Sequence, residues 1–561
     1  MYETPGLTTL ALYAMGGAGL LAALGKARSR VQLSLAKHRS LAGHPRMARR
    51  LAALLPSYRY DARHVFGVDG APGEIVARRS AAFDLLVAQS QRRYAKGLQA
   101  TADVADGLSD LQFVGAYRLP FQFRELAERG LKLASFVQST SGVTVTDLDG
   151  NIFYDLTGSY GVNLFGNDFY KQCIDQGADT VRELGPVLGS YHPVVADNVQ
   201  RLKRVSGMDE ISFHMSGTEA VMQAVRLARY HTARDKLVRF CGSYHGWWGD
   251  VQPGIGNPIA ARDTLTLSEM SEATLRVLRR RKDIACILIN PLQALHPNAA
   301  APSDGALLDS SRKAHFSKPT YTAWLQQLRK ICDERGIALI FDEVFVGFRL
   351  APGGAQEYFG VRSDMVTYGK TLGGGLPIGV VCGKREWMKR FRDDAPADIC
   401  FARGTFNSHP YVMGAMNSFL RRLEDRDIGE LYVDLDVTWN RRAQTLNQAL
   451  SQAGVPVQVA NLSSIWTVLY TQPACYNFLF QHYLRLEGLA LSWVGTGRII
   501  FSLNYSDADF EQVSARFVRA ALAMHCDGWW WLDAAASNKS IKRRILREML
   551  AAKFQSRQPA L

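Results

Sequence analysis

Residues 337–383 read IALIFDEVFVGFRLAPGGAQEYFGVRSDMVTYGKTLGGGLPIGVVCG. Short apolar runs without polar alternation occur in this stretch at residues 337–341, 365–369 and 378–383. Runs of this kind, rich in β-branched and aromatic residues, are typical of strands buried on both faces of a mostly parallel sheet. Asp342 follows the first run and Lys370 follows the second, so two predicted strands have a charged side chain at their carboxyl ends.

The same alternation of strand-like and helical stretches extends upstream. Further strand-like runs are EISFHMSG (210–217), KLVRFCG (236–242) and ACILINP (285–291). This alternation predicts an α/β fold with a mostly parallel sheet covered by helices. We expect a large domain over residues 186–404 and a smaller domain built from residues 126–185 and 405–525. Within the smaller domain, VTVTDLDGNIFYDL (143–156) predicts a β-hairpin that turns at Asp-Gly-Asn.

The composition is that of a globular protein with a substantial core. Of the 561 residues, 47% are hydrophobic and 21% are charged, which excludes a wholly disordered or collagen-like chain. The eight cysteines are scattered and include no CxxC pair. We therefore expect no metal site, no disulfide framework and a reducing compartment.

The N-terminus contains a 19-residue stretch without charge, LTTLALYAMGGAGLLAALG (7–25), which is about the minimum length for a membrane-spanning helix. Basic residues follow this stretch and none precedes it, which would place the rest of the chain at the cytoplasmic face of the membrane. We predict a transmembrane or membrane-anchoring helix over residues 1–25 and a basic helical extension over residues 26–125. An interfacial helix and a buried helix remain alternatives, because Gly, Ala and Thr make the stretch only moderately hydrophobic.

The net charge of +14 is concentrated near the two ends of the chain. Residues 526–561 combine Trp529, Trp530 and Trp531 with a basic amphipathic segment, a pattern typical of helices that lie on membranes. A helix docked on the core of the protein would show the same periodicity, so both interpretations stay open. Basic ends also suit nucleic acid, but the sequence contains no nucleic-acid recognition motif, and we expect no such partner.

Lys370 and Asp342 suggest the chemistry of pyridoxal phosphate (PLP), which needs a lysine, an acid for the pyridine nitrogen, a phosphate-binding loop and a ring clamp. Lys370 ends an apolar strand before three glycines, where backbone can approach a ligand, whereas an isolated lysine is usually a surface charge. Asp342 closes a buried strand, where a carboxylate without a partner would be costly, so a functional role is favoured. Val344 points to the same face and could pack on the ring.

Two further features fit a PLP site. Ser216, Gly217 and Thr218 lie between a predicted strand and a predicted helix, where backbone N–H groups bind phosphate, although a simple helix cap would look the same. Tyr244 follows another predicted strand and could stack on the ring, although a structural tyrosine would also fit. Ligands of open α/β sheets bind at the carboxyl ends of the strands, so we expect these side chains to meet there.

Together these residues resemble the class III aminotransferases of PLP fold type I, and most closely their glutamate-1-semialdehyde aminomutase branch. The resemblance rests on SGTEA (216–220), YHG (244–246), FDEV (341–344), GFR (347–349), GGAQEYFGV (353–361), GKTLGGGLPIG (369–379) and GT (404–405). It extends over about residues 131–524, which is roughly 70% of the chain.

The resemblance implies a role for each candidate residue. Lys370 would be the Schiff-base lysine and Asp342 the partner of the pyridinium nitrogen. Cofactor contacts are implied for Val344, Tyr244 and His245 at the ring, Ser216, Gly217 and Thr218 at the phosphate, and Gln293 at the phenolic oxygen. Thr405 would reach the phosphate of the other subunit in a homodimer with shared active sites. Ser159, Tyr160 and Arg403 would lie near the substrate, and Arg403 and Arg498 could bind a carboxylate or form structural salt bridges.

Departures from the family pattern suggest a reshaped pocket. Asn290 stands where a glutamate commonly precedes the proline, Val346 replaces a threonine, and Ser408-His409 replaces Gly-Asn. We therefore expect an aminotransferase that moves an amino group from an amino-acid donor to an aldehyde or ketone acceptor. Predicted membrane association suggests a hydrophobic acceptor, fatty or polyketide-derived, in lipid or specialised metabolism. The alternatives are an intramolecular aminomutase of the glutamate-1-semialdehyde type and a non-catalytic membrane-tethered scaffold.

Overall fold

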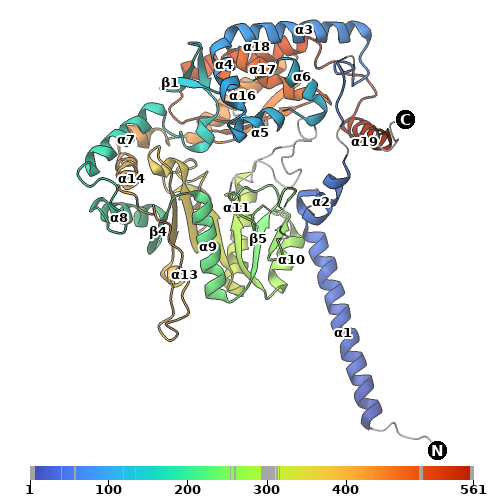
Figure 1. Cartoon of the computed structure of the whole chain (residues 1–561). Coiled ribbons are helices and arrows are strands. Elements are labelled where there is room, and N and C mark those ends of the chain that lie inside the picture. Colours follow the sequence, from blue (N-terminus) through green and yellow to red (C-terminus); the bar gives the residue numbers. More distant parts are fainter. Residues whose placement is uncertain are drawn as a thin grey trace, which may run out of the picture.

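The computed structural model shows a central sheet with its helices, a second α/β layer in the upper half of the view, and helix α1, which extends away from both (Figure 1). The structure describes residues 7–38, 41–55, 58–62, 64–117, 119–132, 134–252, 254–257, 259, 261–291, 310, 314, 316–491 and 497–555.

A seven-stranded sheet forms the centre of the large domain, in the order β4-β10-β9-β8-β7-β5-β6. Its strands are β4 (Glu210–His214), β5 (Lys236–Phe240), β6 (Thr264–Leu267), β7 (Ile284–Ile289), β8 (Ala338–Asp342), β9 (Met365–Gly369) and β10 (Gly379–Gly383). Strand β10 pairs antiparallel with β4 and β9, and all other pairs are parallel. All residues of β7 to β10 are buried, which explains their lack of polar alternation. The predicted mostly parallel α/β sheet is confirmed.

Helices pack around this sheet (Figure 1). They are α8 (Val194–Ser206), α9 (Gly217–Thr232), α10 (Glu272–Arg280), α11 (Lys318–Arg335), α12 (Gly354–Phe359) and α13 (Arg385–Met388), while α7 (Asn167–Val181) and α14 (Pro410–Arg422) pack on each other beside it. Short 3-10 helices occur at Leu41–Gly43, Phe121–Phe123, Gly158–Gly161, Lys370–Gly373 and Asn477–Leu479.

The smaller domain combines segments from both ends of the chain. One sheet contains β1 (Val137–Ser141), β2 (Thr144–Asp147), β3 (Ile152–Asp155) and β13 (Leu489–Ala490), and another contains β11 (Val457–Leu462), β12 (Ile465–Tyr470) and β14 (Arg498–Ile500). The predicted hairpin is formed by β2 and β3, and β13 joins β3 in parallel. The domain also contains α15 (Arg426–Glu430), α16 (Leu435–Gln452), α17 (Phe480–Leu486) and α18 (Asp507–Cys526).

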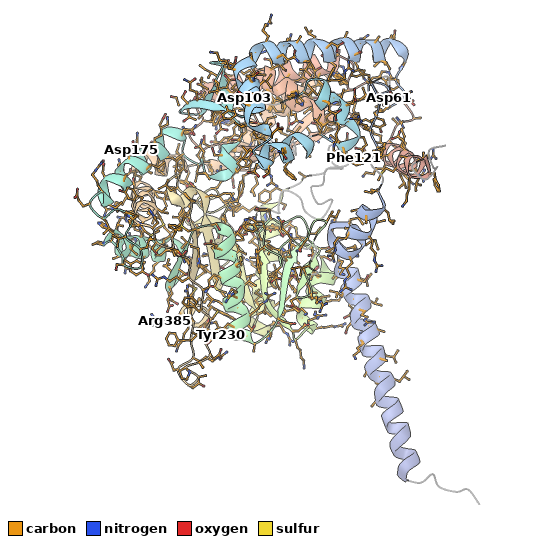
Figure 2. All side chains as sticks on the ribbon, in the orientation of Figure 1. Asp61, Asp103, Phe121, Asp175, Tyr230 and Arg385 are labelled. Carbon is orange, nitrogen blue, oxygen red and sulfur yellow. The ribbon has the colours of Figure 1, made fainter. Side chains whose placement is uncertain are left out.

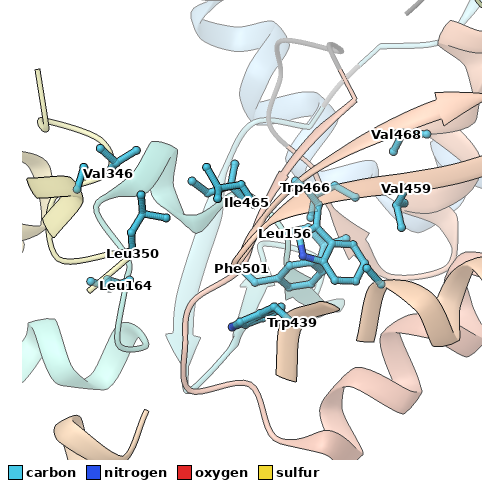
Figure 3. Packing of buried hydrophobic residues seen from close by; sticks show 14 of the residues in the cluster. Leu156, Leu164, Val346, Leu350, Trp439, Val459, Ile465, Trp466, Val468 and Phe501 are labelled. Atoms are coloured by element: carbon cyan, nitrogen blue, oxygen red, sulfur yellow. The ribbon is translucent and has the colours of Figure 1, made fainter. Parts of the chain in front are cut away.

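Aromatic residues form the core of the smaller domain (Figure 3). The ring of Phe501 lies 5.2 Å from that of Trp439 in α16 and 5.1 Å from that of Trp466 in β12, between ring centroids. Val346 and Leu350, from the loop after β8, belong to the same buried cluster. The loop that follows Asp342 is therefore packed against the smaller domain as well as the central sheet.

The N-terminal extension is helical and packs on the smaller domain. Its helices after α1 are α2 (Pro45–Leu54), α3 (Gly73–Arg93), α4 (Ala95–Ala105), α5 (Ser109–Tyr117) and α6 (Arg124–Arg129). Buried Arg79 in α3 donates a hydrogen bond to the carbonyl oxygen of Gly528 at 2.8 Å and pairs with Asp69 at 2.7 Å. Tyr94 donates to the carbonyl oxygen of Arg485 at 3.0 Å.

Helix α1 (Leu7–Ala36) contains the predicted membrane-spanning stretch. No helix among the described residues combines the length and the hydropathy needed to cross a membrane. The predicted transmembrane helix is therefore not supported: glycine, alanine and threonine dilute the apolar stretch, and the same helix continues into Lys26, Arg28 and Arg30.

Two of the three tryptophans of the C-terminal segment are part of the protein core, and Trp531 is half-buried. Trp529 and Trp530 are buried, and their indole N–H groups donate to Tyr483 Oη at 2.7 Å and to Asn477 Oδ1 at 3.1 Å. Of the two interpretations left open for this segment, the burial of Trp529 and Trp530 favours docking on the core of the protein, because their rings are buried and their indole N–H groups have partners inside the protein. Helix α19 (Asn538–Gln555) follows them on the same side of the molecule as α2 (Figure 1).

Candidate active site

Most of the predicted site residues lie at one edge of the central sheet. Strands β4, β5, β8 and β9 run in the same direction, so their carboxyl ends share this edge. Those ends lead into Ser216–Thr218, Tyr244 and His245, Asp342 and Val344, and Lys370. Close contacts link the segments: a Cβ atom on Gly217 would lie 2.6 Å from Val344 Cγ1, and one on Gly246 would lie 2.4 Å from Thr218 Oγ1.

Asp342 is the centre of a buried hydrogen-bond network. Its Oδ2 lies 2.7 Å from Nδ1 of His245, and its Oδ1 accepts hydrogen bonds from the backbone N–H of Val344 at 3.2 Å and the hydroxyl of Thr367 at 3.3 Å. Burial lowers the pKa of His245, although Asp342 raises it, and this favours the neutral ring. A neutral ring in this position would donate from Nδ1 to the Asp342 carboxylate. Three donors therefore fix the orientation of the Asp342 carboxylate.

Arg239 in β5 holds the loop that carries Tyr244 and His245. Its guanidinium donates to the carbonyl oxygens of Val251 and Ser243, and also to Ser243 Oγ at 3.2 Å. Burial lowers the pKa of Arg239 to about 10. Tyr244 is 61% exposed in the single chain, so its ring lies at the open side of the site. Burial, and next the charge of Asp342, raise the pKa of Tyr244.

Lys370 has a strained backbone and a perturbed amine. Its φ is 48°, in the left-handed region that side-chain-bearing residues rarely adopt outside functional sites. Burial lowers the pKa of its amine, Asp342 raises it, and Arg349 and Arg498 lower it. The Nζ atom lies 5.5 Å from the centroid of the Phe345 ring. An amine whose pKa is lowered in this way is neutral, and hence nucleophilic, at lower pH than an ordinary lysine.

Ser159 and Tyr160 lie next to Lys370 along the chain segment that ends at Gly161. Both are exposed and have left-handed φ angles of 45° and 56°. A Cβ atom on Gly161 would lie 2.6 Å from the Phe345 ring and 3.3 Å from Lys370 Cδ, so the segment passes directly beside the lysine. The predicted position of Ser159 and Tyr160 near a substrate stays a prediction.

Two arginines lie beside Lys370: Arg349 is buried and Arg498 is half-buried, and only Arg349 had no role assigned from the sequence. Arg349 donates to the carbonyl oxygens of Phe501 at 2.7 Å, Asn163 at 3.3 Å and Gly161 at 3.4 Å, so it connects the loop after β8 with the 159–161 segment. Burial lowers the pKa of Arg349 to about 10. Its place in a GFR motif was visible in the sequence, but a surface arginine would read the same way.

Arg498 at the start of β14 is the second of these arginines. Burial lowers its pKa, and its charge in turn lowers the pKa of Lys370. Among the described residues, no carboxylate forms an ion pair with Arg498, and its side chain makes no hydrogen bond there. The predicted alternative of a structural salt bridge therefore has no partner in this part of the chain.

No hydrogen bond or ion pair links the remaining predicted residues to this cluster in the described part of the chain. Arg403 and Thr405 are exposed, and the side chains of both lack hydrogen bonds and ion pairs within the described part of the single chain. Gln293 lies outside the described residues. The roles of all three stay predictions.

The residues at the sheet edge fit PLP. Ser216 Oγ caps α9 by accepting a hydrogen bond from Glu219 N at 3.2 Å. The N–H groups of Gly217 and Thr218 at the start of the helix remain for a phosphate. Side chains at Gly217 and Gly246 would collide with Val344 and Thr218, so both positions need glycine. Ser216, Gly217 and Thr218 would hold the phosphate, Asp342 the pyridine nitrogen and Lys370 the carbonyl carbon. These are the groups by which an α/β scaffold positions PLP.

A family model described as aminotransferase class-III matches residues 126–252 and 315–521. The chain belongs to this family and is a PLP-dependent enzyme of fold type I. The match covers most of the two domains that build the site, apart from residues 253–314, and excludes helices α1 to α5 and α19.

Relatives and solved structures agree with this assignment. The glutamate-1-semialdehyde 2,1-aminomutase of Methanococcus maripaludis is 33% identical over 356 residues, covering 60% of this chain and 76% of the relative. The enzyme of that name from Geotalea daltonii is 30% identical over 416 residues, covering 68% and 90%. A transaminase with PLP bound has a TM-score of 0.58 at 27% identity, covering 70% of this chain and 92% of that one. A glutamate-1-semialdehyde aminomutase from Pseudomonas aeruginosa has a TM-score of 0.62 at 18% identity, covering 79% and 98%, and shows the fold alone.

Proposed function

We propose that the enzyme is an aminotransferase that takes the amino group of an amino-acid donor and transfers it to a carbonyl acceptor with an apolar body. Arg498 carries this proposal. Arg498 is half-buried, and desolvation lowers the pKa of its guanidinium. A guanidinium in this position without an acidic partner in the described chain is unfavourable, and a substrate carboxylate would offset that cost. Arg498 lies close enough to Lys370 for its charge to lower the pKa of the amine, so a carboxylate bound to Arg498 would lie near the reacting amine.

The residues around Lys370 support amino-group transfer. When bound, PLP withdraws electrons from the carbon that bears the amino group. The lowered pKa of Lys370 lets its amine take a proton from that carbon and return it elsewhere without a large energetic penalty. Asp342, oriented by His245, holds the proton at the pyridine nitrogen.

Aromatic side chains at the opening of the site support an apolar acceptor. Tyr160 and Tyr244 are exposed there, and Phe345 lies against both Gly161 and Lys370. A fatty or polyketide-derived aldehyde or ketone would bury apolar surface against these rings, whereas a small polar acceptor would not. We therefore place the acceptor in lipid or specialised metabolism.

The test compares two classes of amino donor. Arg498→Met should raise the KM for amino-acid donors by about 10²-fold, the loss expected when a charge-assisted bond to a carboxylate is removed, and should leave simple amines nearly unaffected. Arg280→Met, a change at an exposed arginine at the end of α10 with no assigned role in the site, is the matched control. Equal loss for both donor classes in Arg498→Met would refute carboxylate recognition by this residue.

An intramolecular aminomutase is the second candidate, because the relatives with 30–33% identity carry that name. An aminomutase needs no separate donor. Adding amino acids singly and following the absorbance of the bound cofactor separates the two: conversion by a common amino acid supports the transferase, and conversion by none, with turnover of a diamino or amino-aldehyde substrate, supports the mutase. A non-catalytic scaffold would show neither response.

We further propose that the enzyme is a homodimer in which Thr405 completes the site of the other subunit. Thr405 is exposed in the single chain, and so are the apolar side chains on both sides of it, Phe401 and Phe406, together with Trp247 next to the His245 loop. Exposed aromatics of this size, grouped around a site, are typical of a protein interface.

A further inference from the structure

The net positive charge of the protein comes from two segments. Residues 7–59 contain nine lysines and arginines and no acidic residue, and residues 538–555 contain six and one acidic residue, Glu548. The rest of the chain has 51 cationic and 51 acidic side chains, so these two segments account for the whole formal charge of +14. Solubility alone would not require the excess of lysine and arginine to be concentrated in these two segments.

These two segments lie side by side, although almost the whole sequence separates them. Lys553 Nζ in α19 donates to the carbonyl oxygen of Leu54 at the end of α2 at 3.1 Å, and Tyr60 Oη donates to Glu548 Oε2 at 2.6 Å. Figure 1 shows α2 and α19 on one side of the molecule, with α1 leading away from α2. We call the surface formed by residues 20–35 of α1 together with α2 and α19 the terminal face.

The terminal face is apolar as well as basic. From Leu20 to Val31 every residue of α1 is exposed, and Figure 2 shows α1 extending away from the rest of the molecule. Large exposed apolar side chains are Leu20, Leu21, Leu24, Val31 and Leu35 in α1, Met47, Leu51 and Leu54 in α2, and Leu546, Leu550 and Phe554 in α19. Exposed cations lie among them, notably Lys26, Arg28, Arg30, Arg46, Arg50, Arg543 and Arg547.

The orientation of this face relative to the enzyme is fixed. Ala36 at the end of α1 is buried, and its carbonyl oxygen accepts a hydrogen bond from Ser268 N at 2.8 Å, next to β6 of the central sheet. The acidic Glu548 of α19 is bonded to Tyr60, and Arg59 is paired with Glu128 at 2.6 Å. The exposed cations of the terminal face, Lys26, Arg28, Arg30, Arg46, Arg50, Arg543 and Arg547, form no ion pair within the described residues, so the protein itself does not neutralise the charge of the face.

We propose that the terminal face binds the surface of a membrane that contains anionic lipids. Its cations would contact lipid phosphates, and its leucines, methionine and phenylalanine would enter the boundary between head groups and acyl chains. Nucleic acid would leave these apolar side chains in water, and a second copy of the chain would bring like charges together. The finding that no described helix is suited to span a membrane favours attachment to the surface. No cysteine in the described part of the chain forms a disulfide, which supports the cytoplasmic leaflet. This proposal does not depend on the identity of the substrates.

The experiment is flotation of the full-length holoenzyme with vesicles of phosphatidylcholine, alone or with about one third phosphatidylglycerol. The wild type should float with the anionic vesicles and much less with the neutral ones. Two variants test the face: the charge reversal K26E/R28E/R30E and the polar replacement L20Q/L21Q/L24Q. Each should lower the bound fraction by at least about tenfold.

A matched charge reversal, R92E/K96E/K132E, changes three exposed and unpaired cations outside the terminal face and should float as the wild type does. All variants should keep the cofactor spectrum and the activity of the wild type on a water-soluble donor, which shows that they fold. Failure of the wild type to bind anionic vesicles overturns the proposal, as does equal loss in the control. Binding to duplex DNA that survives L20Q/L21Q/L24Q would assign the face to nucleic acid instead.

Discussion

The reactivity that we assign to Lys370 comes from its surroundings in the fold as well as from the sequence around it. Replacing it by alanine should lower the turnover rate by at least about 10⁴-fold, because the variant loses both the nucleophile and the proton carrier. The phosphate loop and Asp342 are unchanged, so the cofactor should still co-purify, bound non-covalently. Absorbance after gel filtration and single-turnover kinetics measure both effects, with Lys330→Ala, at an exposed lysine, as control. Full transamination by the Lys370→Ala enzyme would refute the assignment.

The pH dependence of the Lys370 amine provides a second prediction at this scale. In the cofactor-free enzyme, acylation of Lys370 should increase with pH and reach its midpoint below the ordinary lysine value of 10.5, because burial and two arginines disfavour the protonated form. Asp342 raises this pKa, so Asp342→Asn should move the midpoint further down, while Arg498→Met should move it up. Peptide mass analysis after brief labelling gives the midpoints. A rise in Asp342→Asn would contradict the assigned causes.

At the scale of elements, the start of α9 depends on a glycine in a different loop. A methyl group on Gly246, whose φ is +90°, would lie 2.4 Å from Thr218 Oγ1. Gly246→Ala should therefore displace the phosphate-binding turn and weaken PLP binding by about tenfold or more. Gly256 has nearly the same φ, +87°, with no atom within 4 Å of a Cβ, so Gly256→Ala should show only the backbone strain of about 1 kcal/mol. Equal Kd values for PLP in the two variants would exclude a contact effect.

The attachment of α3 to the smaller domain depends on Arg79. Its side chain is fully buried, pairs with Asp69 and donates to the carbonyl oxygens of Phe66 and Gly528. Arg79→Met leaves these acceptors unpaired and should destabilise the protein by about 3 kcal/mol. Arg78→Met, one residue away at an exposed position, should cost little. Urea unfolding and hydrogen exchange of α3 measure the difference. Unchanged protection of α3 would show that aromatic packing, not Arg79, fixes the helix.

How far the sequence predicts these elements depends on whether the pattern is local. The buried strands and their charged carboxyl ends could be read directly, because burial on both faces leaves an uninterrupted apolar run. Trp529 and Trp530 could not, since a buried tryptophan and one at a membrane interface have the same local sequence. Arg498 was equally ambiguous, because only the fold shows that no described carboxylate reaches it. The juxtaposition of α2 and α19 involves residues about 500 positions apart and leaves no local signal.

At the scale of the whole molecule, the proposed homodimer predicts that residues from both subunits build each active site. Thr405 is exposed, without side-chain hydrogen bonds to the described residues of its own chain, whereas Lys370 lies beside Gly161 and Phe345 in the interior. If Thr405 serves the partner's site, Thr405→Asp should place a negative charge against the phosphate there and abolish activity in both sites of its homodimer.

Heterodimers of a Lys370→Ala subunit with a Thr405→Asp subunit distinguish the two possibilities. The Thr405→Asp subunit keeps Lys370, and its site would receive the unchanged Thr405 of the partner, so one of the two sites should work and about half of the wild-type activity should return. If Thr405 acts within its own subunit, that same site contains the aspartate and no activity returns. Separate affinity tags allow the heterodimer to be purified, and its activity is then compared with those of both inactive homodimers. Recovery of about half the activity would establish that each active site is built from two chains.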